Sequence, residues 1–522
     1  MTGETMMKRK KLLLGLIAAA LYVLLVVLLP VFERGSAEAT ILSIPQALWY
    51  SLTTLTTVGY GDLVPVTVPG RIIGAAFQLM SLGVLALLVG AFVPLVLGRF
   101  LPSVKLRLSR NKEWFVFPNA SDTALTLARS LYAEDHDRII ILCGGNRHSV
   151  DVPEDLPIIR TPLDPATLAE LKGDGRISVF CMDDVGAENE QLAHELGDDT
   201  CEVYCMTEHE PDRMPERRHC FDPYDCCARL YWRKFPLRSS GESIVIIGEG
   251  KYAEALLAFG LELNVNDSEM HTQYHVFGNY DNFQRDHRRL SAFLSVDAED
   301  PRRDCLFFSK DPWNAHPELI LKASRIVICG DSESDTIEKL TELKRFFPVS
   351  CPIHAKLSLS FDEVHCFGSA EELFTSELVV GSGLNGTAIR MHEIYRSSTK
   401  GYTPTWAELS SFTRRSNIAS AEHLRVKVRI LLGEDAIREE SLTKDICQRA
   451  YDVFVSADET TKERYRRIEH ERWMRFHSMN NWTYAEKRNN AARLHPLLVP
   501  YDILSREDQL KNDYAWELLR EM

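Results

Sequence analysis

Two long uncharged, apolar runs near the N-terminus constrain this chain more than any other feature of its sequence. Residues 12–32 and 72–98 contain no Asp, Glu, Lys or Arg. About 20 apolar residues in a helix cross the roughly 30 Å hydrocarbon core of a bilayer. Neither run has the polar face of a helix on a soluble core. We therefore expect a two-span membrane domain at 1–100, with spans at 12–32 and 72–98 and the lipid bilayer as a partner.

Basic residues flank the outer ends of both runs. Residues 8–11 read KRKK with no small-residue cleavage site after them, and Arg99, Lys105 and Arg107 follow the second run. Cytoplasmic flanks of membrane helices carry an excess of Lys and Arg. The pattern indicates an integral membrane protein of a bacterial-type plasma or inner membrane, with both termini in the cytoplasm.

The loop between the runs holds a short amphipathic segment and the stretch TVGYGD. Residues 45–56 are too few to cross a bilayer, so we expect a re-entrant helix that begins at Pro45. Gly59 and Gly61 permit backbone angles closed to other residues, so that successive carbonyls at 57–62 can point one way. Four such strands would stack oxygen rings from Thr57, Val58, Gly59 and Tyr60, which replace the water shell of K⁺.

The stretch ALWYSLTTLTTVGYGD resembles the potassium-channel pore family, and two spans with one loop resemble its two-transmembrane, tetrameric subclass. The resemblance implies a homotetramer in which Trp49 and Tyr50 brace the filter. Thr53 departs from relatives that have a glutamate behind the filter. The implied selectivity filter is Thr57, Val58, Gly59, Tyr60, Gly61 and Asp62, with K⁺ held at the first four.

The second run contains several candidates for a gate. Gly83 aligns with the hinge glycine of the family, although a glycine in a membrane helix also serves as a packing notch. Gly90 and Pro94 can bend the helix. Leu97 lies where four inner helices would converge, which predicts a hydrophobic constriction.

Beyond a linker at 101–111, short apolar runs alternate with helical stretches. Strands that alternate with helices predict parallel sheets with helices on both faces. We expect two α/β Rossmann-like domains, at 112–240 and 241–390. Residues 112–385 resemble the RCK family (regulators of potassium conductance), whose domains form a ring below a pore. The stretches that carry the resemblance are TPLDPATLAEL and FCMDDVGAENEQLA.

The second Rossmann-like domain carries the turn GEGKYA. Glycines at such a turn let the backbone approach a pyrophosphate at a helix N-terminus. Gly248, Gly250, Ala253 and Asn279 are therefore candidates for a nucleotide or dinucleotide regulator. The alternative is a tight turn that serves helix packing. The corresponding turn of the first domain, PNASDT, has no glycine.

A helical connector at 391–450 leads to a mainly helical module at 451–522. IEHERW, NNWTYAEKRNNAARLHPLLVPYDIL and KND resemble the RyR repeat, whose relatives are associated with nucleotide-type ligands. The resemblance implies that Trp482 and Tyr484 stack a base and that Arg472, Lys487 and Arg488 meet phosphate. For Trp473, core packing is the favoured interpretation, and for Trp482 core packing and ligand contact both stay open. The full candidate set is Glu469, His470, Arg472, Trp473, Trp482, Tyr484, Lys487, Arg488, His495 and Tyr501.

Charge and cysteine spacing restrict the partners. The net charge of -14 disfavours a nucleic-acid polymer. The 12 cysteines show no zinc-site spacing. Acidic runs at 134–137, 297–300 and 331–335 could hold Ca²⁺, with a solvated loop as the alternative.

These features together predict a ligand-gated, potassium-selective channel, not an enzyme. One alternative is a membrane-tethered enzyme that uses a nucleotide, but no nucleophile elbow, zinc pattern or complete dinucleotide fingerprint is present in the sequence. The other is a non-conducting membrane sensor, which would have no need of TTVGYGD.

Overall fold

The computed structural model describes residues 20–95, 101–143, 156–173, 175–197, 201–237, 241–266, 271–295, 303–381, 383–398, 401–433 and 442–522. The chain divides into two compact units, Met1–Arg107 and Leu108–Met522. Each is described by itself.

The first unit is helical. A helix over residues 20–33 is followed by α2 (Ile44–Leu55) and α3 (Val68–Leu95). Ser43 and Gln46 form a capping box at the start of α2, where Pro45 occupies the first turn. The three helices bury a small apolar core that includes Leu29, Ala47 and Phe77.

Among the residues that the structure describes, no helix is both long and apolar enough to span a bilayer. Residues 12–19 of the first predicted span and 96–98 of the second lie outside the described residues. The two spans therefore remain a prediction from sequence. The predicted linker contains α4 (Leu101–Leu108).

The second unit begins with a parallel sheet of six strands in the order β3-β2-β1-β4-β5-β6. Its helices are α5 (Asp122–Glu134), α6 (Pro165–Lys172) and α7 (Gly186–Leu196). The strands are β1 (Trp114–Phe117), β2 (Ile139–Cys143), β3 (Ile158–Thr161), β4 (Ile177–Cys181), β5 (Glu202–Met206) and β6 (Arg218–Phe221).

A second parallel sheet repeats this topology in the order β12-β11-β10-β7-β8-β9, so the first strand of each set is central. The prediction of two Rossmann-like domains is confirmed. The strands are β7 (Ser243–Gly248), β8 (Gln273–Phe277), β9 (Cys305–Ser309), β10 (Arg325–Cys329), β11 (Ile353–Lys356) and β12 (Val364–Phe367), with helices α9 (Lys251–Leu263), α10 (Asp281–Asp286), α11 (Pro317–Lys322) and α12 (Glu333–Phe346).

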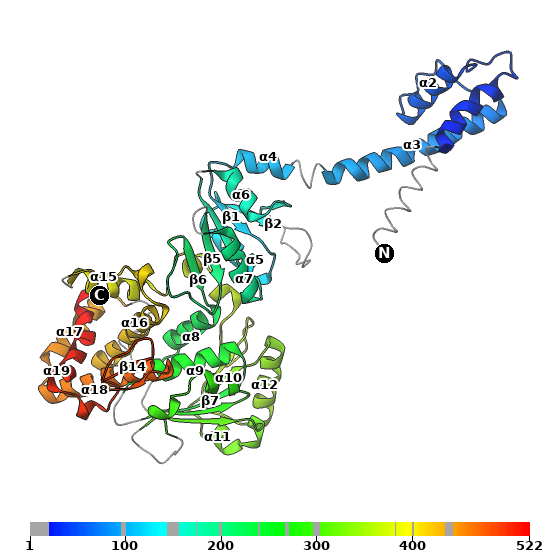
Figure 1. The fold of residues 1–522 in the computed structure, drawn as a ribbon. Coiled ribbons are helices and arrows are strands. Elements are labelled where there is room, and N and C mark those ends of the chain that lie inside the picture. The colour runs from blue at the N-terminus through cyan, green and yellow to red at the C-terminus, as the bar shows by residue number, and fades with distance from the viewer. Residues whose placement is uncertain are drawn as a thin grey trace. The chain divides into compact units, whose positions relative to one another are not determined.

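The two Rossmann-like domains interlock. Helix α8 (Pro223–Lys234), which follows the first sheet, packs along α9 of the second domain, and Figure 1 shows both helices in green between the two sheets. Trp232 of α8 donates its indole N–H to the Leu256 carbonyl at 3.0 Å. Two helices of the second domain, α13 (Ala370–Leu373) and α14 (Ser376–Val379), likewise pack on α5 of the first domain.

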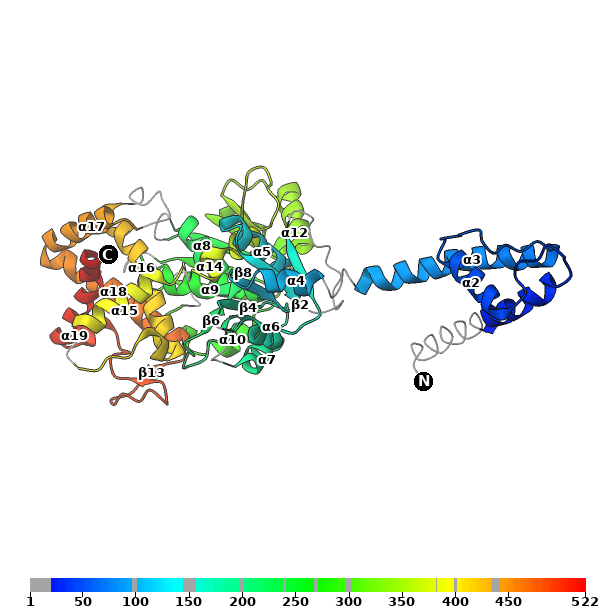
Figure 2. The ribbon, with the colours of Figure 1, turned by 90° about the horizontal axis from the view of Figure 1, so that it is seen from above.

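The C-terminal part is mainly helical and lies to one side of the sheets in Figure 2. Leu424, Phe454, Ile468 and Trp516 are buried in its core. Its elements are α15 (Gly386–Ser398), α16 (Ser411–Leu432), α17 (Lys444–Ser456), α18 (Glu459–Met479), the strand pair β13 (Thr483–Tyr484) and β14 (Leu494–His495), α19 (Arg506–Leu510) and α20 (Tyr514–Glu517).

Buried ion pairs fasten this helical part to both Rossmann-like domains. Glu422 of α16 lies 2.8 Å from Arg229 and 2.5 Å from Arg233, both on α8. Burial of Glu422 acts to raise its pKa, but the two guanidinium groups prevail and lower that pKa to about 2. Arg475 of α18 lies 2.6 Å from Asp304, directly before β9. The helical part therefore cannot shift against the sheets without exposing or unpairing buried charges.

Candidate functional site

The backbone of the TVGYGD segment alternates between two conformations. Thr57, Gly59 and Gly61 have φ of 61°, 56° and 75°, whereas Val58 and Tyr60 between them do not have positive φ. Alternation of left- and right-handed residues aligns successive peptide groups, with N–H groups on one side and carbonyls on the other. The segment therefore presents a row of carbonyl oxygens. Thr57 adopts the left-handed region without the freedom of glycine, at a cost of about 1–2 kcal/mol.

Helix α2 and an aromatic contact hold this segment. The carbonyl of Thr53 in α2 accepts hydrogen bonds from the backbone N–H groups of Val58 and Gly59, at 2.9 and 3.1 Å. Trp49 donates its indole N–H to the Asp62 carboxylate at 2.9 Å and stacks on Tyr60, with ring centroids 5.9 Å apart. One face remains open within a single chain, since Val58 and Tyr60 are 54% and 67% exposed.

A residue that the sequence analysis did not single out supports the loop after the segment. The buried Glu33 carboxylate accepts from the N–H groups of Val66 and Thr67, both at 3.0 Å, and from the Thr67 hydroxyl at 2.7 Å. These bonds tie the end of the first helix to the start of α3. A lone acid directly after an apolar run was the only available sequence signal.

The structure describes the position of three of the four predicted gating residues. Gly83 lies in α3, and among the described atoms of the chain none lies within 4 Å of a Cβ added there. Gly90 and Pro94 also fall within α3, whereas Leu97 lies outside the described residues.

The glycine turn of the second Rossmann-like domain is closely packed. A Cβ at Gly248 would lie 1.8 Å from the Cys329 carbonyl oxygen, and one at Gly250 would lie 2.8 Å from the Asp331 carboxylate. Glu249 accepts from the N–H of Asn279 at 2.6 Å. Two carboxylates thus stand at the N-terminus of α9, where a pyrophosphate would have to bind. Close backbone packing accounts for Gly248, and the positive φ of 86° accounts for Gly250. Ala253 is buried.

Carboxylates of the described acidic runs form ion pairs with basic side chains of the same chain. Glu134 pairs with Arg138 at 2.6 Å, and Asp335 pairs with Lys339. The run at 297–300 lies outside the described residues. In the part of the chain that the structure covers, no group of three or more His, Cys, Asp or Glu side chains could hold a metal ion.

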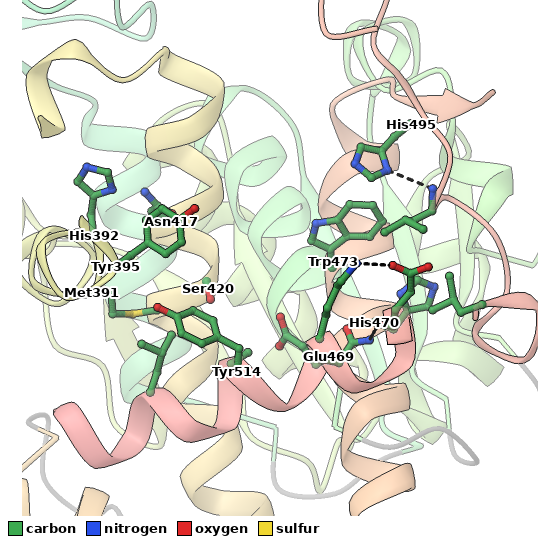
Figure 3. A pocket seen from close by; sticks show the side chains of 17 residues that line it. Met391, His392, Tyr395, Asn417, Ser420, Glu469, His470, Trp473, His495 and Tyr514 are labelled. Carbon is green, nitrogen blue, oxygen red and sulfur yellow. Dashed lines mark hydrogen bonds and ion pairs between the residues drawn. The ribbon is translucent and has the colours of Figure 1, made fainter. Parts of the chain in front are cut away.

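A cavity of about 440 Å³ opens between α15, α16, α18 and the C-terminal segment. That volume is typical of small-molecule sites. Figure 3 shows His392, Tyr395, Asn417 and Ser420 on one side of it and Trp473, His470 and His495 on the other. We call this cavity the C-terminal pocket.

Four predicted residues line the C-terminal pocket: Glu469, His470, Trp473 and His495. The favoured interpretation of Trp473 as core is not what the structure shows, because this half-buried ring forms part of the wall. The rings of His495 and Trp473 pack edge to face, with their centroids 4.9 Å apart.

The other six predicted residues lie elsewhere. Trp482 is buried against Phe412, with ring centroids 5.0 Å apart, and Tyr501 is buried beneath Arg467. Arg472 is buried and bonded to Glu469 at 2.6 Å, so it is not available to a phosphate. Tyr484, Lys487 and Arg488 are exposed on the β13–β14 segment and are not among the lining residues.

Sequence reasoning missed the opposite wall. His392, Tyr395, Asn417, Ser420 and Tyr514 come from α15, α16 and α20, and four of the five precede the module at 451–522. Polar residues on the α16 face were the available signal, but only the tertiary fold brings that face to Trp473.

Comparison with known proteins identifies one domain near each end of the chain. Residues 11–97 match the family model described as ion channel, and residues 453–522 match that of the RyR domain. The chain carries an ion channel domain and a RyR domain. The ion channel domain contains the TVGYGD segment, and the RyR domain contributes one wall of the C-terminal pocket.

Curated relatives match a short part of the chain. The A-type voltage-gated potassium channel KCND3 of Homo sapiens and that of Rattus norvegicus are each 41% identical over 68 residues, which is 13% of this chain and 10% of the relative. This chain thus spans about a tenth of the length of these relatives.

Two solved structures with low similarity scores extend over more of the chain. The GsuK channel has a TM-score of 0.36 and 15% identity, covering 71% of this chain and 99% of that one. The GsuK channel bound to NAD has a TM-score of 0.35 and 12% identity, covering 72% and 85%.

Proposed function

We propose that this chain is the subunit of a homotetrameric, potassium-selective channel in a bacterial-type plasma or inner membrane, with both termini in the cytoplasm. The observation that carries the proposal is the alternating backbone of Thr57, Gly59 and Gly61 inside an ion channel domain. A row of aligned carbonyls serves a dehydrated cation, and four copies around an axis supply a complete coordination shell.

The open face of the filter segment supports assembly. In one chain the segment exposes Val58 and Tyr60 to the surroundings, while Thr53 and Trp49 hold it from behind. Irregular backbone at membrane depth is tolerated where it is buried in protein or lines a water-filled path. A fourfold axis in front of the segment meets that condition.

We further propose that a nucleotide-type ligand gates the channel through the cytoplasmic domains. Helix α16 contributes Asn417 and Ser420 to the C-terminal pocket and also Glu422 to the buried pairs with α8. One rigid element thus touches both the ligand cavity and the Rossmann-like domains. A ligand shifts the gate only by the difference between its affinities for the open and closed arrangements.

Potassium release from liposomes that contain the purified full chain tests the channel proposal. Gly59→Ala should abolish release, because alanine at φ 56° is strained and would disturb the carbonyl row. Gly35→Ala is the matched control, since Gly35 lacks positive φ and an added Cβ would lie 3.9 Å from its nearest neighbour. Absence of release from the folded wild-type tetramer would favour a non-conducting sensor, and turnover of a nucleotide would favour an enzyme.

A further inference from the structure

The chemistry of the C-terminal pocket separates two classes of nucleotide-type ligand. A polyphosphate needs cations with donors to spare, whereas a nucleobase needs flat walls and neutral hydrogen-bonding groups. The described lining residues supply flat walls and neutral hydrogen-bonding groups, but no cation with donors to spare, as their contacts show.

The charged residues that line the pocket already have partners. Glu469 lies 2.7 Å from Lys427 and 2.6 Å from Arg472, and both cations are buried behind it. These two cations hold the pKa of Glu469 far below its usual range, against the effect of burial. Lys511 is the one cation among the described lining residues, and it lies 2.7 Å from Asp508.

Two of the lining imidazoles, His470 and His495, are neutral and differ in the hydrogen-bonding groups that they present to the cavity. The Nε2–H of His470 donates to the Val499 carbonyl at 2.8 Å, which leaves Nδ1 as an acceptor. In His495, Nδ1 accepts from the N–H of Leu497 at 3.1 Å, so Nε2 carries the proton as a donor. Burial lowers the pKa of both residues, which keeps them uncharged at neutral pH.

Two further polar groups face the cavity without protein partners. Within the described part of the chain, the Asn417 amide and the Ser420 hydroxyl make no side-chain hydrogen bond, and Figure 3 shows both at the pocket. The amide can donate and accept at once. Across the cavity Trp473 offers its ring, with Tyr514 at the rim. This combination of a flat apolar wall and facing neutral donors and acceptors is suited to the edge of a heteroaromatic ring.

We propose that the C-terminal pocket binds an uncharged heteroaromatic base, as the free base or as a nucleoside, and does not bind a polyphosphate. In this arrangement Trp473 stacks the ring, while Asn417 and Ser420 bond its edge. A triphosphate would bring negative charge to a cavity whose own carboxylates, Glu469 and Asp508, engage the nearby cations. The proposal rests on the gating proposal for its biological role, but binding is measured without flux.

Equilibrium dialysis of the full chain in detergent tests the proposal with adenosine, guanosine, cytidine and uridine against their 5′-triphosphates. At least one nucleoside should bind at least tenfold more tightly than its triphosphate. Trp473→Ala and Asn417→Ala should each weaken that binding at least tenfold. Asn417 is half-buried and makes no side-chain bond, so its variant keeps the test valid if Trp473→Ala fails to fold.

Tyr484→Ala and Arg488→Ala are the matched controls, since both residues were candidates from sequence and both lie outside the lining. They should change nucleoside affinity by less than twofold. Equal or tighter binding of triphosphates, a tenfold loss in Arg488→Ala, or no binding of any nucleoside would overturn the proposal. Nucleoside binding without any change in potassium release would instead leave this proposal intact and contradict gating.

Discussion

At the scale of single residues, a few side chains and backbone angles define the filter segment. Thr57 and Gly59 take left-handed backbone, and the carbonyl of Thr53 holds the N–H groups of Val58 and Gly59. The glycine spacing alone predicted aligned carbonyls. The role of Glu33 could not be predicted, because its partners lie more than 30 residues further along the chain.

Glu33→Gln should destabilise the ion channel domain. A buried carboxylate that accepts three hydrogen bonds is replaced by an amide whose NH₂ group faces N–H donors, at an expected cost of about 1–3 kcal/mol. The temperature at which the heated tetramer dissociates, followed by size-exclusion chromatography, should fall. Glu38→Gln is the control, since Glu38 is exposed and its carboxylate makes no described hydrogen bond. An equal dissociation temperature in both variants would contradict this role.

The residues of the C-terminal pocket show where sequence reasoning stops. Helical spacing identified an aromatic, polar face on α18. It could not tell which aromatic rings other residues of the fold bury. The structure places Trp482 against Phe412 and leaves Trp473 at the cavity, whereas the sequence favoured core packing for Trp473 and left Trp482 open. Phe412 comes from α16, so the choice depends on tertiary contacts that no local pattern contains.

At the scale of elements, strand and helix alternation predicted most of both sheets. The edge strands β6 and β12 were missed because RHCF and VHCF are short and mix polar with apolar residues. The interlocking of α8 with α9 was also not predictable, since it joins elements across a domain boundary that appears in sequence as a simple linker. That contact makes α8 a shared element, and α16 is fastened to it through Glu422.

Glu422→Gln should destabilise the second unit strongly, because it removes the carboxylate that Arg229 and Arg233 share. Removing one partner of a buried pair costs about 3–5 kcal/mol. The melting temperature of the full chain in detergent should fall well below that of Glu393→Gln. This control breaks an exposed Arg–Glu pair on α15, worth less than about 1 kcal/mol. Equal melting of the two variants would show that the pairs with α8 do not fasten α16.

The same carboxylate makes the stability of the second unit sensitive to acid. The folded pKa of Glu422, about 2, lies below the ordinary value of 4.5, so its stabilising contribution is present above pH 5. That contribution is lost as the pH falls from about 5 towards 2. The wild type should therefore lose melting temperature more steeply over this window than Glu422→Gln. Parallel curves for the two proteins would contradict the assignment.

At the scale of the whole molecule, the RyR domain is an integral part of the second unit. Arg475 neutralises the buried Asp304 of the second Rossmann-like domain, and Glu469 neutralises the buried Lys427 of α16. Deletion of residues 453–522 should therefore lower the melting temperature of the rest of the second unit and expose apolar surface of α16 and α17. An unchanged melting temperature in the truncated chain would contradict this view. Point variants such as Asn417→Ala are thus better probes of ligand response than truncation.

The central claim is that four copies of the filter segment conduct potassium selectively. The most direct test is the reversal potential of the reconstituted full chain in a planar bilayer, with KCl on one side and NaCl on the other. The account predicts a reversal potential close to the potassium equilibrium potential, and loss of this selectivity or of all current in Gly59→Ala. A wild-type reversal potential near zero, with clear current, would contradict it.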